Sequence, residues 1–398
     1  MRERDQDERE VSSSIGKRSM IPEDAFEQDV WEGTLGAEEE LWLADPETTK
    51  LAGGAQKILA RAPEGHYTGE LIDCEIESNT GVHKEPSGVL GDLVERRRYL
   101  LKEAERLGRL LGMSGTHPVG DWHEQEIIDQ PHYRRLEDKL GWLIKRNNTF
   151  ALHTHYAVKG REKVIYLYNR LREYVPYFLA LSVNSPFWQG EITDMQSSRV
   201  LIFSRSIHRA GVPDPLNSWD EYADYVDYVE RSGAIQKLGE IWWDVRPAPQ
   251  LSTIELRACD TQTTPWRTES LVALTAALCE ALKEEYESGE KRPIRPTREI
   301  EENKWSAQRY GLEGDFVDHD SHESAPIQKV MDRWLETLEA RTGRDLSAVR
   351  GILDEPTEAD RQLEVWRETG SAVEVARDVA KRTRASVEEP LRGVRGEG

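Results

Sequence analysis

Cysteine is scarce in this chain of 398 residues, which has only Cys74, Cys259 and Cys279. Their number is odd and they lie far apart, which argues against a disulfide framework and against a zinc finger. Long apolar runs are missing too, since no stretch approaches the ~20 residues that a helix needs to cross a bilayer. Residues 1–20 are charged and rich in serine, without the apolar segment of a signal peptide. We therefore expect a protein of the reducing cytoplasm.

Positive charge is in deficit. The sequence has 74 Asp and Glu against 53 Lys and Arg, which gives a formal net charge of −21. Such a field repels nucleic acid and anionic membrane surfaces, so neither is an expected partner. It also repels anionic small molecules, so bound anions would need arginines or a metal ion to hold them. A generally acidic surface explains the same charge equally well.

The sequence has no G-K-[S/T] loop, no G-x-G-x-x-G loop and no internal repeat, so any nucleotide site must be built differently. Residues 1–30 and 386–398 are expected to be disordered or loosely held tails. Between them we expect a single domain over 31–385, with a sheet core over 31–290 and a helical extension over 291–385.

Helical periodicity marks several segments of the chain. These are residues 90–111, 162–183, 219–229, 269–286, 325–338 and 372–379. Beyond residue 297 nearly all of the chain is helical in character. Before it, helices alternate with short strand-like runs, which predicts an α+β protein.

The run GAEEELWL, residues 36–43, reads as one of these strands. Alternate side chains of a strand point to opposite faces of the sheet. Glu38 and Glu40 therefore share one face, and Glu39 falls on the other, largely apolar face. For a single run, a half-exposed antiparallel strand with its charges in solvent is the ordinary explanation.

Four other runs repeat the pattern, with ionisable residues on one face and apolar residues on the other. The polar positions are Asp73, Glu75 and Glu77 in LIDCEIE, His153 and His155 in FALHTHYAV, Asp244 and Arg246 in IWWDVRP, and Glu255, Arg257 and Cys259 in TIELRAC. Solvated strand faces usually mix Lys, Thr, Ser and Gln, whereas these faces hold no Lys. The concentration of Glu, Asp, His and Arg predicts a curved sheet whose inner face collects them around one hollow.

Several carboxylates that lie close together need a positive counter-charge, because mutual repulsion raises their pKa values. Mg²⁺ or Mn²⁺ would supply it through oxygen ligands, and arginines on the same face could hold phosphate or carboxylate groups. These are the components of phosphoryl transfer. Two alternatives stay open. The H-x-H pair with carboxylates also suits a zinc-dependent amide hydrolase, and a non-catalytic metal- or nucleotide-binding protein would show the same residues.

Several stretches in order along the chain are familiar as a set: GAEEELWLADPET, ELIDCEIESNTGV, THPVGDW, LHTH, LSVNSPFWQG, SSRVLIF, WWDVRPAPQLSTIELRACD and ENKWSAQRYGLEG. From about residue 33 to about residue 385 the chain resembles the glutamate–cysteine ligase type 2 family of carboxylate–amine ligases. The resemblance implies a glutamine-synthetase-like α+β fold, in which a curved, mainly antiparallel sheet forms a funnel with helices packed outside.

The resemblance also implies ATP-dependent ligation with Mg²⁺, or Mn²⁺, as the metal. A carboxylate, typically the γ-carboxylate of glutamate, would form an acyl phosphate that an amine, typically that of cysteine, then attacks. Small molecules are the implied partners, and family members commonly form homodimers.

Carried onto this sequence, the implied metal ligands are Glu38, Glu40, Glu77, His153 and Glu255. Arg257 would clamp the transferring phosphate, while Arg246 and Arg199 would hold a substrate carboxylate or phosphate. Arg309 is a candidate contact for the nucleotide, or it only completes a helix that ends at Gly311. Asp73 and Glu75 are interpreted as solvated neighbours of Glu77.

The chain departs from the family pattern in three motifs. In HPVGDW, Val119 and Gly120 follow the proline where an aromatic residue is frequent. His83 stands where many members have the cysteine of T-x-V-C, and HTHYA at residues 153–157 replaces H-V-H-V-G, with Thr154 and Tyr156 at the valines. We expect these positions to line or support the pocket, so they bear on the amine substrate more than on the chemistry.

Overall fold

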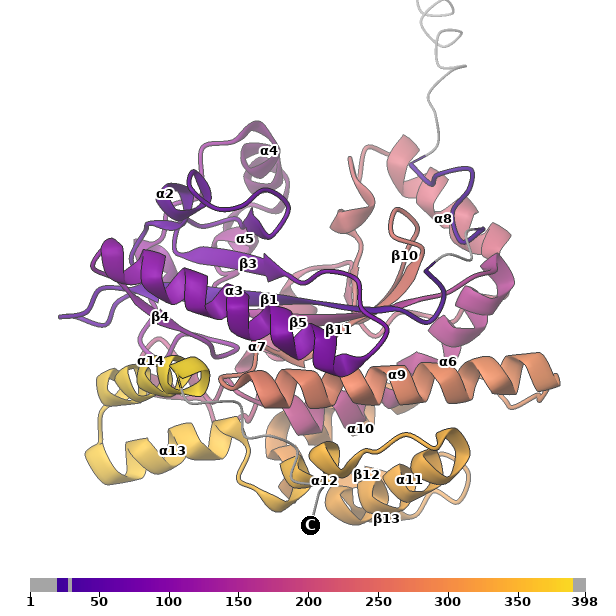
Figure 1. Ribbon diagram of the computed structural model, residues 1–398. Helices are drawn as coiled ribbons and strands as arrows, with labels where there is room; N and C mark the ends of the chain where they lie inside the picture. Colours follow the sequence, from indigo (N-terminus) through magenta and orange to yellow (C-terminus); the bar gives the residue numbers. More distant parts are fainter. Residues whose placement is uncertain (1–19, 28–30, 389–398) are drawn as a thin grey trace, which may run out of the picture.

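One antiparallel sheet organises the protein (Figure 1). The structure, a computed structural model, describes residues 20–27 and 31–388. In spatial order the strands are β10 (Val245–Ala248), β11 (Thr253–Asp260), β5 (Ala151–Ala157), β1 (Leu35–Ala44), β3 (Glu75–Asn79) and β2 (Tyr67–Gly69), with β4 (Leu110–Gly112) also paired with β1.

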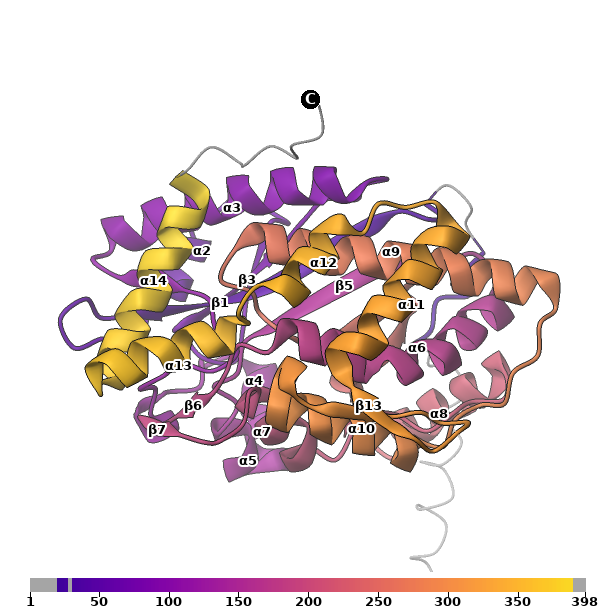
Figure 2. The ribbon, with the colours of Figure 1, turned by 90° about the horizontal axis from the view of Figure 1, so that it is seen from below.

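Helices cover the sheet in layers. One face carries α3 (Pro86–Arg106), α6 (Arg161–Ser182) and α9 (Pro265–Ser288). Beside them α14 (Ala372–Glu388) packs directly on β4. Seen from below in Figure 2, a further layer lies outside, made of α10 (Thr297–Tyr310), α11 (Ile327–Thr342), α12 (Ser347–Asp354) and α13 (Glu358–Thr369). On the other side of the sheet lie α2 (Ala55–Leu59), α4 (Pro131–Leu140), α5 (Trp142–Lys145) and α8 (Trp219–Arg231).

Short elements complete the chain. They are α7 (Ser198–Ser206), the pairs β6 (Phe187–Trp188) with β7 (Glu191–Ile192), β8 (Ala210–Gly211) with β9 (Trp242–Trp243), and β12 (Asp315–Val317) with β13 (Ser324–Pro326). The expected α+β architecture, with a mainly antiparallel sheet and helices outside, is confirmed. Among the described residues, no helix combines the length and the apolar character that a membrane crossing requires.

The apolar face of β1 explains how the sheet holds its helices. Leu35, Ala37, Leu41 and Leu43 are all buried, and each buried leucine contributes about 2 kcal/mol of transfer free energy. The neighbouring strand β5 is buried along all seven residues, so the centre of the sheet is covered on both faces.

The predicted helices mostly agree with the structure, but the segment 90–111 differs. Its helix begins earlier, at Pro86, and ends at Arg106. Gly108 then adopts a positive φ of 64°, which reverses the chain without the steric cost that a side chain would bring. The last residues of the segment enter β4 and pair with β1.

The ends of the chain also differ from expectation. Within the expected tail 1–30, Phe26 is fully buried and its ring lies 5.3 Å from that of Trp219, so residues 20–27 pack on the core. The remaining positions of both tails lie outside the described residues, apart from 386–388, which belong to α14.

Two strand-like runs depart from simple alternation. The register of β11 against β5 shifts between Leu256 and Cys259, which marks a β-bulge. The bulge turns Cys259 from the polar face, where strict alternation places it, into the hydrophobic core, the usual place of a lone cysteine. The IWWDVRP run is split into β9 and β10 by Asp244, whose carboxylate accepts a hydrogen bond from buried Lys304 at 2.7 Å.

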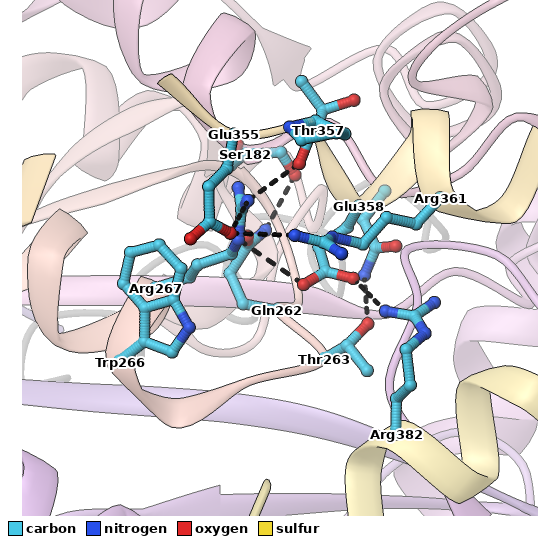
Figure 3. A network of polar contacts seen from close by, with 12 residues as sticks. Ser182, Gln262, Thr263, Trp266, Arg267, Glu355, Thr357, Glu358, Arg361 and Arg382 are labelled. Atoms are coloured by element: carbon cyan, nitrogen blue, oxygen red, sulfur yellow. Dashed lines mark hydrogen bonds and ion pairs between the residues drawn. The ribbon is translucent and has the colours of Figure 1, made fainter. Parts of the chain in front are cut away.

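A buried ion-pair network holds α13 and α14 against α9 (Figure 3). Glu358, at the start of α13, is 2% exposed and contacts Arg382 of α14. Its other oxygen lies 3.5 Å from Nε of Arg267 of α9. Burial opposes ionisation, but the two arginines outweigh it and lower the pKa of the Glu358 carboxyl. The charge of Glu358 therefore stabilises the packing of three helices.

Replacing Glu358 by Gln should destabilise the protein by about 3 kcal/mol, the lower end of the range for a broken buried ion pair. The buried Arg267 would lose its nearest carboxylate, whereas the partly exposed Arg382 would keep Asp378 at 2.6 Å.

The matched control is Glu124→Gln, since Glu124 pairs with Lys50 at 2.6 Å and both side chains are about half exposed; it should cost about 1 kcal/mol at most. Thermal unfolding at neutral pH checks both values. Equal losses of stability in the two variants would show that the buried ion pairs stabilise the protein no more than an exposed ion pair does.

The difference in stability between wild type and Glu358→Gln should depend on pH. Since the folded-state pKa of Glu358 lies below its unfolded value near 4.5, its stabilising effect is complete above about pH 4.5. The stability difference between wild type and Glu358→Gln should then shrink as the pH falls through the lowered pKa.

Candidate active site

A cavity of about 530 Å³ lies on the sheet face opposite α6 and α9. Its walls come from the sheet, from α2, α4, α5 and α7, and from the segment before β10. Twelve of the 28 described lining residues are acidic, basic or histidine, and they are Glu38, Glu40, Glu70, Glu75, Glu77, His132, His153, Arg199, Lys237, Glu240, Arg246 and Arg257.

Strand register brings the predicted site residues together. In the β1–β5 pairing Glu38 stands opposite His153, and in the β1–β3 pairing Glu40 stands opposite Glu77. Glu255 of β11 stands opposite His155 of β5. Residues remote in sequence therefore form a continuous polar row across the sheet, as the alternation predicts.

Three groups within this row have the geometry of a metal site. Within each group, the potential ligand atoms lie within 4.8 Å of one another. The groups are Glu38 with His155 and Glu255, Glu38 with Glu77 and His153, and Glu40 with Glu70 and Glu77. All five predicted metal ligands occur in at least one group.

The two histidines contact Glu38 from β5. Nδ1 of His153 lies 3.0 Å from Oε2 of Glu38, and Nε2 of His155 lies 3.3 Å from its Oε1. Burial, reinforced by the charge of Arg257, lowers the pKa of His153. Nε2 of His153 is buried without a hydrogen-bond partner. A neutral imidazole with a free ring nitrogen is the form that binds a metal ion. Nε2 of His155 instead faces Glu38, and although burial lowers the pKa of His155, the charges of Glu38 and Glu255 raise it overall.

The acidic side chains at the β3 end of the row are electrostatically strained. Burial, followed by repulsion from Glu40, raises the pKa of Glu70 to about 8. Burial and neighbouring carboxylates also raise the pKa of Glu75 and of Glu77. A divalent cation would offset this repulsion and favour the ionised carboxylates, so the residues present fit such an ion.

The opposite end of the row is basic. Glu255 is fully buried between Arg246, whose Nη2 lies 2.6 Å from Oε2, and Arg257, which contacts Oε1. Although burial acts against it, these two arginines hold the pKa of Glu255 far below its usual range. Glu255 therefore stays ionised and fixes both guanidinium groups beside the carboxylate row.

Arg199 enters the cavity from the first turn of α7. Its guanidinium donates to the backbone oxygens of Arg257 at 3.2 Å and Ala258 at 3.4 Å, and it lies 3.8 Å from Asp260. Arg199 thus braces the bulged part of β11, while its Nε is buried without a partner.

Arg309 does not join the other predicted residues. It lies at the end of α10, where it donates to the backbone oxygen of Asp194 and lines a separate hollow of about 250 Å³ with Trp366 and Arg367. Arg309 is not among the described residues that line the large cavity.

Sequence reasoning missed several lining residues. Glu75 is 3% exposed and lines the cavity, so its interpretation as a solvated neighbour is wrong. Glu70 follows β2 directly, and Lys237 lies in a loop, so neither belongs to an alternating run. Asp73 is not among the described residues that line the cavity. Its carboxylate instead accepts a hydrogen bond from the backbone N–H of Gln56 at 2.8 Å. The proximity of Glu70 to the polar runs in the sequence was the only available signal.

The sequence is similar to known proteins over most of its length. The sequence matches the model of glutamate–cysteine ligase family 2 (GCS2) over residues 34–381. A protein of Rubrobacter xylanophilus, provisionally named glutamate–cysteine ligase 2-2, is 64% identical over 369 residues, which cover 93% of this chain and 96% of that protein. A provisionally named glutamate–cysteine ligase 2 of Sorangium cellulosum is 36% identical over 362 residues, covering 88% of this chain and 96% of that one.

Among solved structures, the glutamate–cysteine ligase of Francisella tularensis in complex with AMP is similar, with a TM-score of 0.64 at 12% identity. The alignment covers 93% of this chain and 91% of that one. At this identity the likeness shows a shared fold. The family match covers most of the sequence, so the chain belongs to glutamate–cysteine ligase family 2, a family of ATP-dependent ligases that form an amide bond.

Proposed function

We propose that the chain joins the γ-carboxylate of glutamate to an amine at the cost of ATP, with Mg²⁺ held in the carboxylate row. The observation that carries this proposal is the juxtaposition of a row of acidic and imidazole ligands with two arginines fixed by Glu255. Hard oxygen ligands favour Mg²⁺ or Mn²⁺ over softer metals.

The metal would be held by Glu38, Glu40, Glu77, His153 and Glu255. When bound, it neutralises and orients the phosphates of the nucleotide. His155 and Glu70 lie in the same ligand groups and would complete or support the coordination.

The arginines supply the fixed positive charge that the reaction needs. In the first step a carboxylate oxygen bonds to the γ-phosphorus, the bond from that phosphorus to the bridging oxygen breaks, and ADP leaves. Negative charge gathers on the transferring phosphoryl group, which Arg257 and Arg246 are placed to stabilise without reorganising. Arg199 would add a third contact to a carboxylate or phosphate.

In the second step the amine nitrogen attacks the carbonyl carbon of the acyl phosphate. A C–N bond forms, the C–O bond to phosphate breaks, and inorganic phosphate leaves. The nitrogen gives up one proton before attack and a second as the amide forms. Exclusion of water by the buried walls of the site favours aminolysis over hydrolysis.

An ADP-release screen tests the proposal. The protein is given Mg²⁺ or Mn²⁺, ATP and glutamate, alone and with a panel of amines and amino acids. We expect ADP and phosphate only when a carboxylate and an amine are both present, with the amide found by mass spectrometry. Amide hydrolysis restored to the apo-protein by Zn²⁺ without ATP would support the hydrolase instead, and ATP binding without any ADP would indicate a binding protein.

A further inference from the structure

A second cavity, of about 450 Å³, shares Glu38 with the active-site cavity as a lining residue. Its walls come from the start of β1, from residues 79–82 and from residues 250–253, and His155 and Ala157 of β5 line it as well. Because Glu38 and His155 also belong to a metal-ligand group, the cavity ends beside the reacting centre.

The two cavities differ in charge. Arg199, Arg246 and Arg257 line the larger one. In the smaller one, the ionisable side chains among the described lining residues are Glu38 and His155, and none is a lysine or arginine. The larger cavity therefore suits the phosphates and the carboxylate substrate. The smaller one has no lysine or arginine for a carboxylate, and its one basic side chain, His155, already faces Glu38 at 3.3 Å and Glu255 at 4.0 Å. It also places an acidic group at its inner end.

The outer part of the smaller cavity is apolar. Trp31, Val82 and Leu251 all line it, and they are 50%, 61% and 57% exposed. Large apolar side chains that gather at one opening with this exposure mark a binding surface for an apolar group. Thr80, Asn79 and Gln250 add only neutral polar groups.

Two of the motifs that depart from the family pattern border this cavity. Val82 precedes His83, and Ala157 stands where the glycine of H-V-H-V-G is frequent. His83 itself is turned to Asp92, at 2.9 Å, and its backbone pairs with Leu35 at the cavity wall. Of the altered positions, Ala157 lines the smaller cavity. Thr154 and Tyr156 are buried on the helix-covered face of β5, where Thr154 contacts Thr275, so the expectation that these two line the pocket is wrong.

We propose that the smaller cavity binds the amine substrate and that this substrate is an alkyl or arylalkyl monoamine without a carboxylate, not an amino acid. The ammonium group would approach Glu38, and the apolar group would lie against Trp31, Val82 and Leu251. The net charge of −21 attracts such a cation and repels amino acids with a surplus of negative charge. This inference rests on the proposed ligase function and specifies its second substrate.

Matched pairs of substrates test the inference in the ADP-release assay with glutamate. Phenethylamine is compared with phenylalanine, and cysteamine with cysteine, because each pair differs only in the carboxylate. The amine of each pair should have the higher kcat/KM by at least about tenfold, since the carboxylate finds no cation. Equal or better use of the amino acids would overturn the inference while leaving the ligase function intact. No ADP with any amine would overturn both.

A charge added at the opening gives a second test. Val82→Arg should shift the kcat/KM ratio within each pair at least several-fold toward the amino acid, because it supplies the missing cation. The matched control is Val317→Arg, since Val317 is 43% exposed on β12 and does not line the cavity; its ratio should equal that of wild type. An unchanged ratio in Val82→Arg would show that the amine binds elsewhere.

Discussion

Replacing Glu255 by Gln should lower kcat by about 100- to 1000-fold or more, the usual effect of removing preorganised charge from an active site. Glu255 is fully buried, belongs to a metal-ligand group and contacts Arg246 and Arg257. A glutamine would keep the shape of the side chain but remove the negative charge that fixes both arginines. Steady-state ADP release at saturating ATP measures the loss.

The control for Glu255→Gln is Glu358→Gln, which also neutralises a buried carboxylate between two arginines. Glu358 lines a separate hollow beside α13 and α14. It is not among the described residues that line the active-site cavity. Its variant should lose stability but keep the kcat of the folded enzyme. Similar kcat losses in both variants, after correction for the folded fraction, would contradict a specific role of Glu255 in the reaction.

Neutralising Glu38 and neutralising Glu39 should have opposite consequences, although the residues are adjacent. Glu38 faces the cavity, where it contacts His153 and His155. Glu38→Gln should abolish turnover, because it removes a proposed metal ligand that belongs to two of the candidate groups, while the thermal unfolding midpoint stays near that of wild type.

Glu39 faces the helices and is fully buried. It accepts from Nε of Arg97 at 2.9 Å and from the hydroxyl of Thr268 at 2.6 Å. Glu39→Gln should therefore cost about 3–5 kcal/mol, because it leaves the buried charge of Arg97 uncompensated, while the folded fraction keeps its kcat. Thermal unfolding and ADP release on both variants check this. Loss of turnover in Glu39→Gln with normal stability would refute the assignment of faces.

Strand alternation explains how much of the site could be predicted from the sequence. The period of two in GAEEELWL separates Glu38 and Glu40 from Glu39 whatever the rest of the chain does. The same rule places Glu77, His153 and Glu255 correctly, because each lies in a regular strand.

The rule fails where the backbone is irregular or the contact is distant. Cys259 follows a β-bulge, which adds one residue and reverses the face. Asp244 is held by Lys304, sixty residues away in sequence. Glu70 and Lys237 lie in connections between elements, whose paths depend on tertiary packing that a single sequence does not encode locally. Arg309 belongs to a recognisable motif, yet its helix ends away from the large cavity.

Divalent-ion binding tests the central claim most directly. Mn²⁺ is titrated into wild type, Glu77→Gln and Glu358→Gln in the presence of ADP, and free Mn²⁺ is measured by electron paramagnetic resonance. We expect saturable binding in wild type and in Glu358→Gln, and at least about a 10- to 100-fold weaker affinity in Glu77→Gln. Equal affinity in all three proteins would contradict the proposal that the polar face of the sheet holds the metal.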